Sequence, residues 1–195
     1  MVHVPELLFS RLLEVREVLM FSFDFELLEQ PLDAAEYTTP SPWLPAFTLP
    51  GASATVVGRD AMGGVYLTCE FSSARSRRCL HLDTRGHVVL LGETLQDAVT
   101  LVVALPYWRE LLIECSAAGL EAMRTHAFRL EREVCEDLPA LPEARSYLQQ
   151  FLGFPVLADA VGCLCELMAQ THSVTVLSPH GWRYESPTAR VARPT

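Results

Sequence analysis

Two histidines and an aspartate lie close together at His81, Asp83 and His87, and such side chains can perform acid–base chemistry or bind a metal. The apolar runs on either side of Thr84-Arg85-Gly86 predict a β-hairpin with a tight turn. In that hairpin Asp83 lies opposite His87, so an imidazole and a carboxylate could meet. The solvated face of a hairpin also carries such residues, and the segment has no Ser or Cys nucleophile. A hydrolase or metalloenzyme using His81, Asp83 and His87 is therefore an alternative interpretation, and we assign no catalytic residue.

A second group with metal-binding residue types consists of Cys163, Cys165 and His172. The apolar pattern around the two cysteines predicts a helix, on which residues two apart point roughly 200° away from each other. Both thiolates could not then face one metal ion, so we expect no metal site and no cofactor.

Three glycines, Gly58, Gly63 and Gly64, invite comparison with a phosphate-binding loop. They lie between two predicted strands, and neither a Gly-Lys-Ser/Thr run nor a dinucleotide fingerprint accompanies them. Turn geometry at positive φ is the simpler interpretation.

Four acidic residues gather at the end of a predicted helix: Glu131, Glu133, Glu136 and Asp137. Carboxylates there oppose the helix dipole, so the cluster is either a solvated face or a docking patch for a basic protein. The whole chain carries a net charge of −9, from 24 acidic and 15 basic residues. This charge disfavours nucleic acid and anionic lipid as partners.

The hydrophobic periodicity predicts an α+β fold with a central, mostly antiparallel sheet packed by helices. We expect one domain over residues 1–195, with a sheet core at about 54–92, a helical part at about 94–172 and a closing β-hairpin at about 173–185. The predicted strands are 21–27, 54–57, 65–71, 80–82 and 87–91, and the predicted helices are 6–19, 95–105, 107–114, 120–134, 142–151 and 156–172. The last helix should be buried nearly all round, because it carries only two charges. The proline-rich segment 31–50 should be irregular and should bring Trp43 and Phe47 into the core.

A cytoplasmic location is expected from the start of the chain, which has no cationic stretch followed by an apolar run. The six cysteines are then reduced thiols. The longest uncharged stretch, residues 37–58, contains four prolines and cannot form a membrane helix. The sequence has no lysine or asparagine, which is typical of a GC-rich bacterial genome.

The run from Gly58 to Leu112 resembles the SUKH superfamily of bacterial immunity proteins. The shared features are a turn and strand with Asp60, Gly63, Gly64 and Tyr66, an apolar strand that ends in Leu-Gly at Gly92, and then a helix. Residues 174–185 also look like the closing hairpin of some members.

The resemblance implies a non-enzymatic α+β protein that neutralises a cognate polymorphic toxin, often a nuclease with a basic surface, by direct binding. A general interaction or regulatory module on the same fold is the second interpretation. The sequence does not predict the oligomeric state.

Overall fold

The structure is a computed structural model that describes residues 6–34, 47–71, 77–115, 119–178 and 181–187. Within these residues it contains seven helices and a five-stranded antiparallel sheet, which confirms the α+β prediction. The helices are α1 (Glu6–Glu14), α2 (Arg16–Phe23), α3 (Leu95–Ala104), α4 (Trp108–Cys115), α5 (Leu120–Asp137), α6 (Leu141–Leu152) and α7 (Ala160–Thr171). The strands are β1 (Glu26–Asp33), β2 (Ala52–Arg59), β3 (Val65–Phe71), β4 (Arg77–Leu82) and β5 (Val88–Gly92).

The sheet is a meander in which each strand pairs with the next one along the chain, in the order β1-β2-β3-β4-β5. The register of β3 and β4 sets Tyr66 opposite His81. The register of β4 and β5 sets His81 opposite Val89. These three side chains therefore share one face of the sheet.

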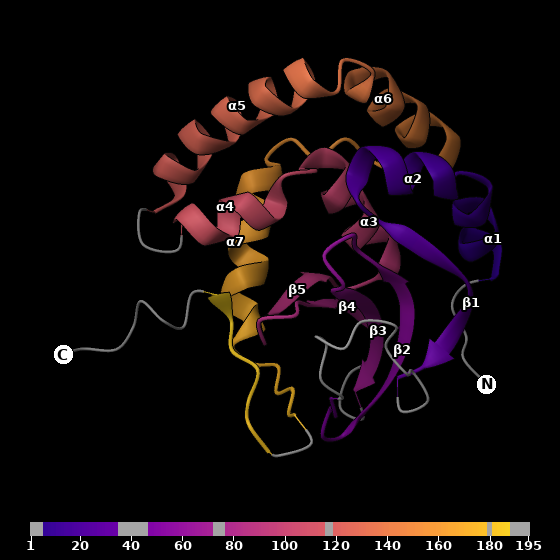
Figure 1. Ribbon diagram of the computed structural model, residues 1–195, viewed down its shortest axis with the longest axis vertical. Coiled ribbons are helices and arrows are strands. Elements are labelled where there is room, and N and C mark those ends of the chain that lie inside the picture. Colours follow the sequence, from indigo (N-terminus) through magenta and orange to yellow (C-terminus); the bar gives the residue numbers. More distant parts are fainter. Residues whose placement is uncertain (1–5, 35–46, 72–76, 116–118, 179–180, 188–195) are drawn as a thin grey trace.

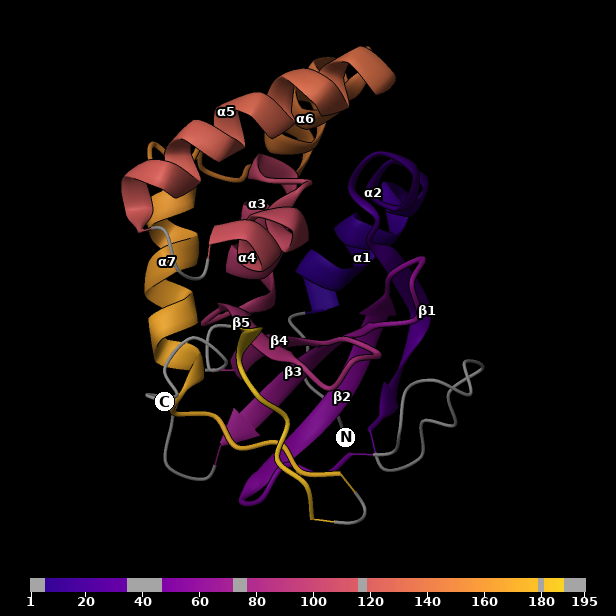
Figure 2. The ribbon, with the colours of Figure 1, turned by 60° about the vertical axis from the view of Figure 1, so that its left-hand side comes forward.

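The helices pack on one side of the sheet, as Figures 1 and 2 show. α3 packs on β4 and β5, and α7 packs on β5. α5 packs on α4 and α7, and together with α6 it forms the layer farthest from the sheet. The end of β5 passes close under the start of α3, because a Cβ on Gly92 would lie 2.7 Å from the backbone nitrogen of Ala98.

The strands in the middle of the sheet are buried on both faces. In the predicted strand 65–71, residues that alternate with the apolar ones are also buried: the exposed fractions of Tyr66 and Thr68 are 0% and 7%. Helices cover one face of these strands, while segments such as the buried Phe47 and Val176 contribute to the core from elsewhere.

The predicted strand over residues 21–27 is also wrong. Helix α2 continues to Phe23, and Leu19 and Phe23 are buried at helical spacing, while Phe21 is 72% exposed. The chain turns at Asp24, whose φ of 51° is left-handed, and β1 begins at Glu26. The alternating phenylalanines span the end of α2 and the turn before β1. The last residues of the helix therefore showed the two-residue period of a strand.

Strand β1 then runs through Pro31 to Asp33, so the irregular segment begins later than predicted. A proline is tolerated there because β1 is an edge strand, where a missing N–H breaks no internal ladder. Phe47 is buried as expected, whereas Trp43 lies outside the described residues.

The last helix and the closing hairpin differ from their predictions. α7 is buried on one side only, and Glu166, Ala169 and Gln170 on it are exposed. The closing segment forms isolated bridges rather than two strands, including one between Leu177 and Arg183. Thr94 caps α3 by accepting a hydrogen bond from the backbone N–H of Asp97, and the chain breaks between α3 and α4 at Pro106, as the separate predicted helices 95–105 and 107–114 required.

Candidate functional site

A cleft of about 520 Å³ lies between α4 and the hairpin formed by β4 and β5. Its wall contains imidazole, carboxylate, guanidinium and apolar side chains. They come from Asp60, Met62, Gly64, His81, Asp83, Thr84, Arg85, His87, Val89, Trp108, Arg109, Glu110, Leu112 and Pro187. All three residues of the predicted His81, Asp83 and His87 group line this cleft.

The base of the cleft is a buried histidine–aspartate pair. Nε2 of His81 lies 2.8 Å from Oδ2 of Asp60, and both side chains are 2% exposed. The backbone N–H groups of Met62 and Gly64 donate to the other oxygen, Oδ1, at 2.9 and 2.8 Å. Because a carboxylate only accepts hydrogen bonds, Nε2 of His81 carries the hydrogen.

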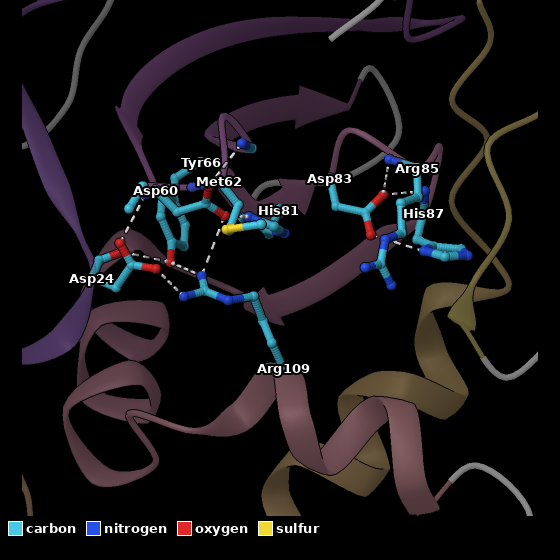
Figure 3. Close-up of polar contacts among 11 residues, drawn as sticks. Asp24, Asp60, Met62, Tyr66, His81, Asp83, Arg85, His87 and Arg109 are labelled. Atoms are coloured by element: carbon cyan, nitrogen blue, oxygen red, sulfur yellow. Dashed lines mark hydrogen bonds and ion pairs between the residues drawn. The ribbon is translucent and has the colours of Figure 1, made fainter. Parts of the chain in front are cut away.

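Arg109 on α4 connects this pair to the turn between α2 and β1 (Figure 3). Its guanidinium pairs with Asp24, and Nη1 lies 3.3 Å from Oδ2 of Asp60. Nη1 also donates to the hydroxyl of Tyr66 at 3.2 Å. The Asp24 carboxylate accepts a hydrogen bond from the backbone N–H of Ala61, so one network joins α4, the α2–β1 turn and the β2–β3 turn.

Burial and charge oppose each other in this network. Burial alone would raise the pKa of Asp60, but the hydrogen bond and charge of His81 and the charge of Arg109 together lower it. Burial would likewise lower the pKa of Arg109, but its interactions with Tyr66, Asp24 and Asp60 raise it. Burial raises the pKa of Tyr66. Asp60 is therefore a carboxylate and Tyr66 a neutral donor at neutral pH.

Only one of the three glycines compared with a phosphate loop has the positive φ that we predicted. Gly63 turns the chain with a φ of 86°, while Gly58 and Gly64 lie outside the left-handed region. A Cβ on Gly64 would lie 2.6 Å from both Oδ2 of Asp60 and Nε2 of His81. Close approach of the buried pair, not backbone conformation, requires glycine at position 64.

A second histidine–aspartate pair lies at the mouth of the cleft. Nδ1 of His87 is 2.8 Å from Oδ2 of Asp83, which confirms the predicted contact across the hairpin. The backbone N–H groups of Arg85 and His87 donate to the other Asp83 oxygen. Burial would raise the pKa of Asp83, but these hydrogen bonds and the His87 charge lower it. Figure 3 shows this pair beside the Asp60 network but separate from it.

Two side chains at the cleft lack a partner for their polar groups. Trp108 is 1% exposed, and its indole Nε1 is the one buried side-chain nitrogen or oxygen without a hydrogen bond in the described part of the chain. Arg85 is exposed, and its guanidinium forms no ion pair within the described ranges. Trp108 also packs edge-on against His81, with ring centroids 5.0 Å apart.

The arrangement divides the predicted catalytic group in two. His81 pairs with Asp60, and its ring packs against Tyr66 and Trp108. His87 pairs with Asp83 through Nδ1, and both side chains are more exposed than those of His81 and Asp60. Among the residues for which the structure gives positions, no three His, Cys, Asp or Glu side chains are grouped as metal ligands. Cys163 and Cys165 are partly buried on α7.

The acidic end of α5 lies outside the cleft lining, and three of its carboxylates have arginine partners. Glu131 accepts two hydrogen bonds from Arg145 on α6, at 2.7 and 3.0 Å. Glu133 pairs with Arg129 and Glu136 with Arg132, each one turn away. Docking of a partner on Glu131, Glu133, Glu136 and Asp137 stays a prediction.

Sequence reasoning missed Asp24, Arg109 and Trp108. Asp24 and Arg109 are 85 positions apart, and no local pattern pairs them. The one available signal was the Trp-Arg pair directly after the Pro106 break, which places a large ring and a cation at a helix start. Of the residues that carry the SUKH resemblance, Asp60, Gly64 and Tyr66 all contact the network.

The fold and the site define an α+β protein with an open, partly apolar cleft above a buried ionic network. Comparisons with protein-family models, with curated proteins and with solved structures found no significant match. Membership of the SUKH superfamily therefore stays a prediction. No helix in the described ranges is both long and apolar enough to cross a membrane.

Proposed function

We propose that this chain is a non-enzymatic, cytoplasmic immunity protein that binds a cognate toxin, with the cleft between α4 and the β4–β5 hairpin as part of the binding surface. The observation that carries this proposal is the internal pairing of the charged groups in the cleft wall. Asp60 pairs with His81, Asp83 pairs with His87, and Arg109 pairs with Asp24. These groups hold three segments of the chain in place, which is how a binding surface is preorganised.

The opening of the cleft has the mixed composition of a recognition surface. Met62 is 74% exposed, and Val89 and Leu112 add apolar wall. Arg85 and Glu110 supply charges of both signs at the rim. An apolar centre with a polar rim is typical of protein interfaces.

The test uses the full chain and an Arg85→Glu variant as paired baits in a lysate of the source organism. Proteins held by the wild type and lost by the variant are identified and produced in a second bacterium. We expect one of them to arrest growth alone, and co-production of the wild type to restore growth while Arg85→Glu does not. The proposal would be contradicted if none of the proteins bound only by the wild type arrested growth, or if the Arg85→Glu variant still restored growth.

The general interaction module stays the second interpretation, and the growth assay separates it from the first. A specific, cleft-dependent partner without toxicity would favour the module. A basic nuclease as partner would fit the net charge of −9, because opposite charge accelerates association.

One observation favours a hydrolase as another candidate. Asp83 orients His87 so that Nε2 is available as a general base at the cleft mouth. Thr84 is the only hydroxyl side chain in the described cleft lining, so water would be the nucleophile. Hydrolysis of ester or phosphodiester probes by the wild type, lost in His87→Ala and kept in Arg132→Ala, would support this function; equal rates in all three proteins would exclude it.

A further inference from the structure

Two residues that line the cleft, Trp108 and Arg85, carry hydrogen-bond donors that the described fold leaves unused. The indole N–H of Trp108 is buried without an acceptor, and an unmet buried donor destabilises a fold. The Arg85 guanidinium has no carboxylate partner among the described residues. Both residues line the same cleft.

We propose that the cleft binds a carboxylate on an extended peptide segment, with Arg85 and the Trp108 indole N–H as its donors; this inference rests on the proposed protein-binding function. A guanidinium and a neutral N–H together suit an acceptor group that carries a single negative charge. The side chains next to that carboxylate would pack on Met62, Val89 and Leu112.

The charges around the site favour a carboxylate over a phosphate. Asp60, Asp83 and Glu110 all line the cleft, and the Arg109 charge is already countered by Asp24 and Asp60. A doubly charged phosphate would therefore meet one unpaired cation and three carboxylates. A carboxylate, with a single negative charge, meets less repulsion. The net charge of −9 on the chain also repels a dianion more than a monoanion.

The size of the cleft also suits a short peptide segment. Its volume of about 520 Å³ lies within the range of about 300–1,000 Å³ seen for ligand pockets. The cleft is partly open to solvent, so a chain can enter with one side chain or its terminus pointing inward.

The experiment titrates four small probes into the full-length protein labelled with ¹⁵N and follows the indole N–H resonance of Trp108, assigned with Trp108→Phe. N-acetyl-leucine offers a terminal carboxylate, and N-acetyl-glutamic acid α-methylamide offers a side-chain carboxylate. N-acetyl-leucinamide has no carboxylate, and inorganic phosphate tests the other anion. We expect at least one carboxylate probe to shift the Trp108 resonance saturably, and the amide and phosphate to bind about tenfold more weakly or not at all.

Arg85→Gln removes the cation at an exposed position and should weaken carboxylate binding about tenfold, while the matched Arg132→Gln on α5 should not. Binding by the terminal or by the side-chain probe identifies the source of the carboxylate, and either supports the inference. Equal binding of the amide, tighter binding of phosphate, no shift with any probe, or no effect of Arg85→Gln would overturn it.

The outcome separates this inference from the proposed function. If the carboxylate probes bind but no toxin partner exists, the site stands and the immunity function fails. If a toxin is captured and neutralised but the probes do not bind, the function stands and the carboxylate site is wrong.

Discussion

Gly64 is the position where a single added methyl group tests the buried network most directly. In Gly64→Ala the new Cβ would lie 2.6 Å from Oδ2 of Asp60, 2.6 Å from Nε2 of His81 and 2.9 Å from the backbone oxygen of Leu82. None of these atoms can move freely, because the first two belong to side chains that are 2% exposed and the third is backbone. The methyl must therefore push the pair apart or displace the strand.

The expected loss of stability follows from these two possibilities. Overpacking a filled core costs about 1–3 kcal/mol. Separation of a buried ion pair costs about 3–5 kcal/mol when one partner is left uncompensated. We expect Gly64→Ala to lower the free energy of unfolding by about 2–5 kcal/mol, which leaves a folded but weakened protein if the wild type has the usual 5–15 kcal/mol.

Urea denaturation followed by far-ultraviolet circular dichroism measures this change, with Gly181→Ala as the control. Gly181 has a φ of 77°, and nothing lies within 4 Å of its hypothetical Cβ, so that variant reports backbone strain alone, about 1 kcal/mol. An Asp60→Ala background removes one of the three close contacts and gives the His81 ring space to move away, so the cost of Gly64→Ala should fall by more than about 1 kcal/mol. Equal costs in both backgrounds, or a loss no larger than that of Gly181→Ala, would refute the reasoning.

Three further measurements address other parts of the fold. Asp60→Asn should destabilise the protein by about 3 kcal/mol at neutral pH. The folded pKa of Asp60 lies below its ordinary value of 3.8, so the stabilisation from the carboxylate is present above that value and is lost as the pH falls through the folded pKa. Urea denaturation curves of the wild type and Asp60→Asn should therefore converge in acid. Thr94→Ala removes the acceptor for the backbone N–H of Asp97 at the start of α3 and should cost about 1 kcal/mol by the same assay, whereas an unchanged midpoint would argue against the cap. Arg145→Met breaks the paired hydrogen bonds to Glu131 between α6 and α5 and should cost about 1–2 kcal/mol, measured as a lower melting temperature; no change would mean that solvent replaces the pair.

Local sequence signals predicted the parts of the site that are built locally. Asp83 and His87 are four residues apart across a tight turn, so recognition of the hairpin was enough to bring them together. The Asp60–His81 pair spans 21 residues and depends on the register of β3 against β4 and on the turn before β3. Neither the register nor the burial of that face follows from the residues alone.

Two features of the fold could not be predicted from the alternation of apolar and polar residues. Alternation of apolar and polar residues indicates a strand only if one face meets water, and it places polar side chains on the wet face. Here helices cover the face that carries Tyr66 and His81, and these two polar side chains are 0% and 2% exposed. The strand predicted over residues 21–27 was wrong because Phe21, which is exposed on α2, fits an alternating apolar pattern.

Burial of these polar residues also explains what the cleft can offer to another molecule. A buried charge or hydroxyl must find a partner, and in this fold Asp60, His81, Tyr66 and Arg109 find one another. Their polar groups thus bond to one another and tie α4 to β3 and to the two neighbouring turns. Two cleft-lining residues keep donors that the network does not use: the buried indole N–H of Trp108 on α4 and the exposed guanidinium of Arg85 on the hairpin. Variants of the network should therefore change stability first, and so should variants of Trp108, which is 1% exposed, whereas variants of the exposed Arg85 should change binding at nearly constant stability.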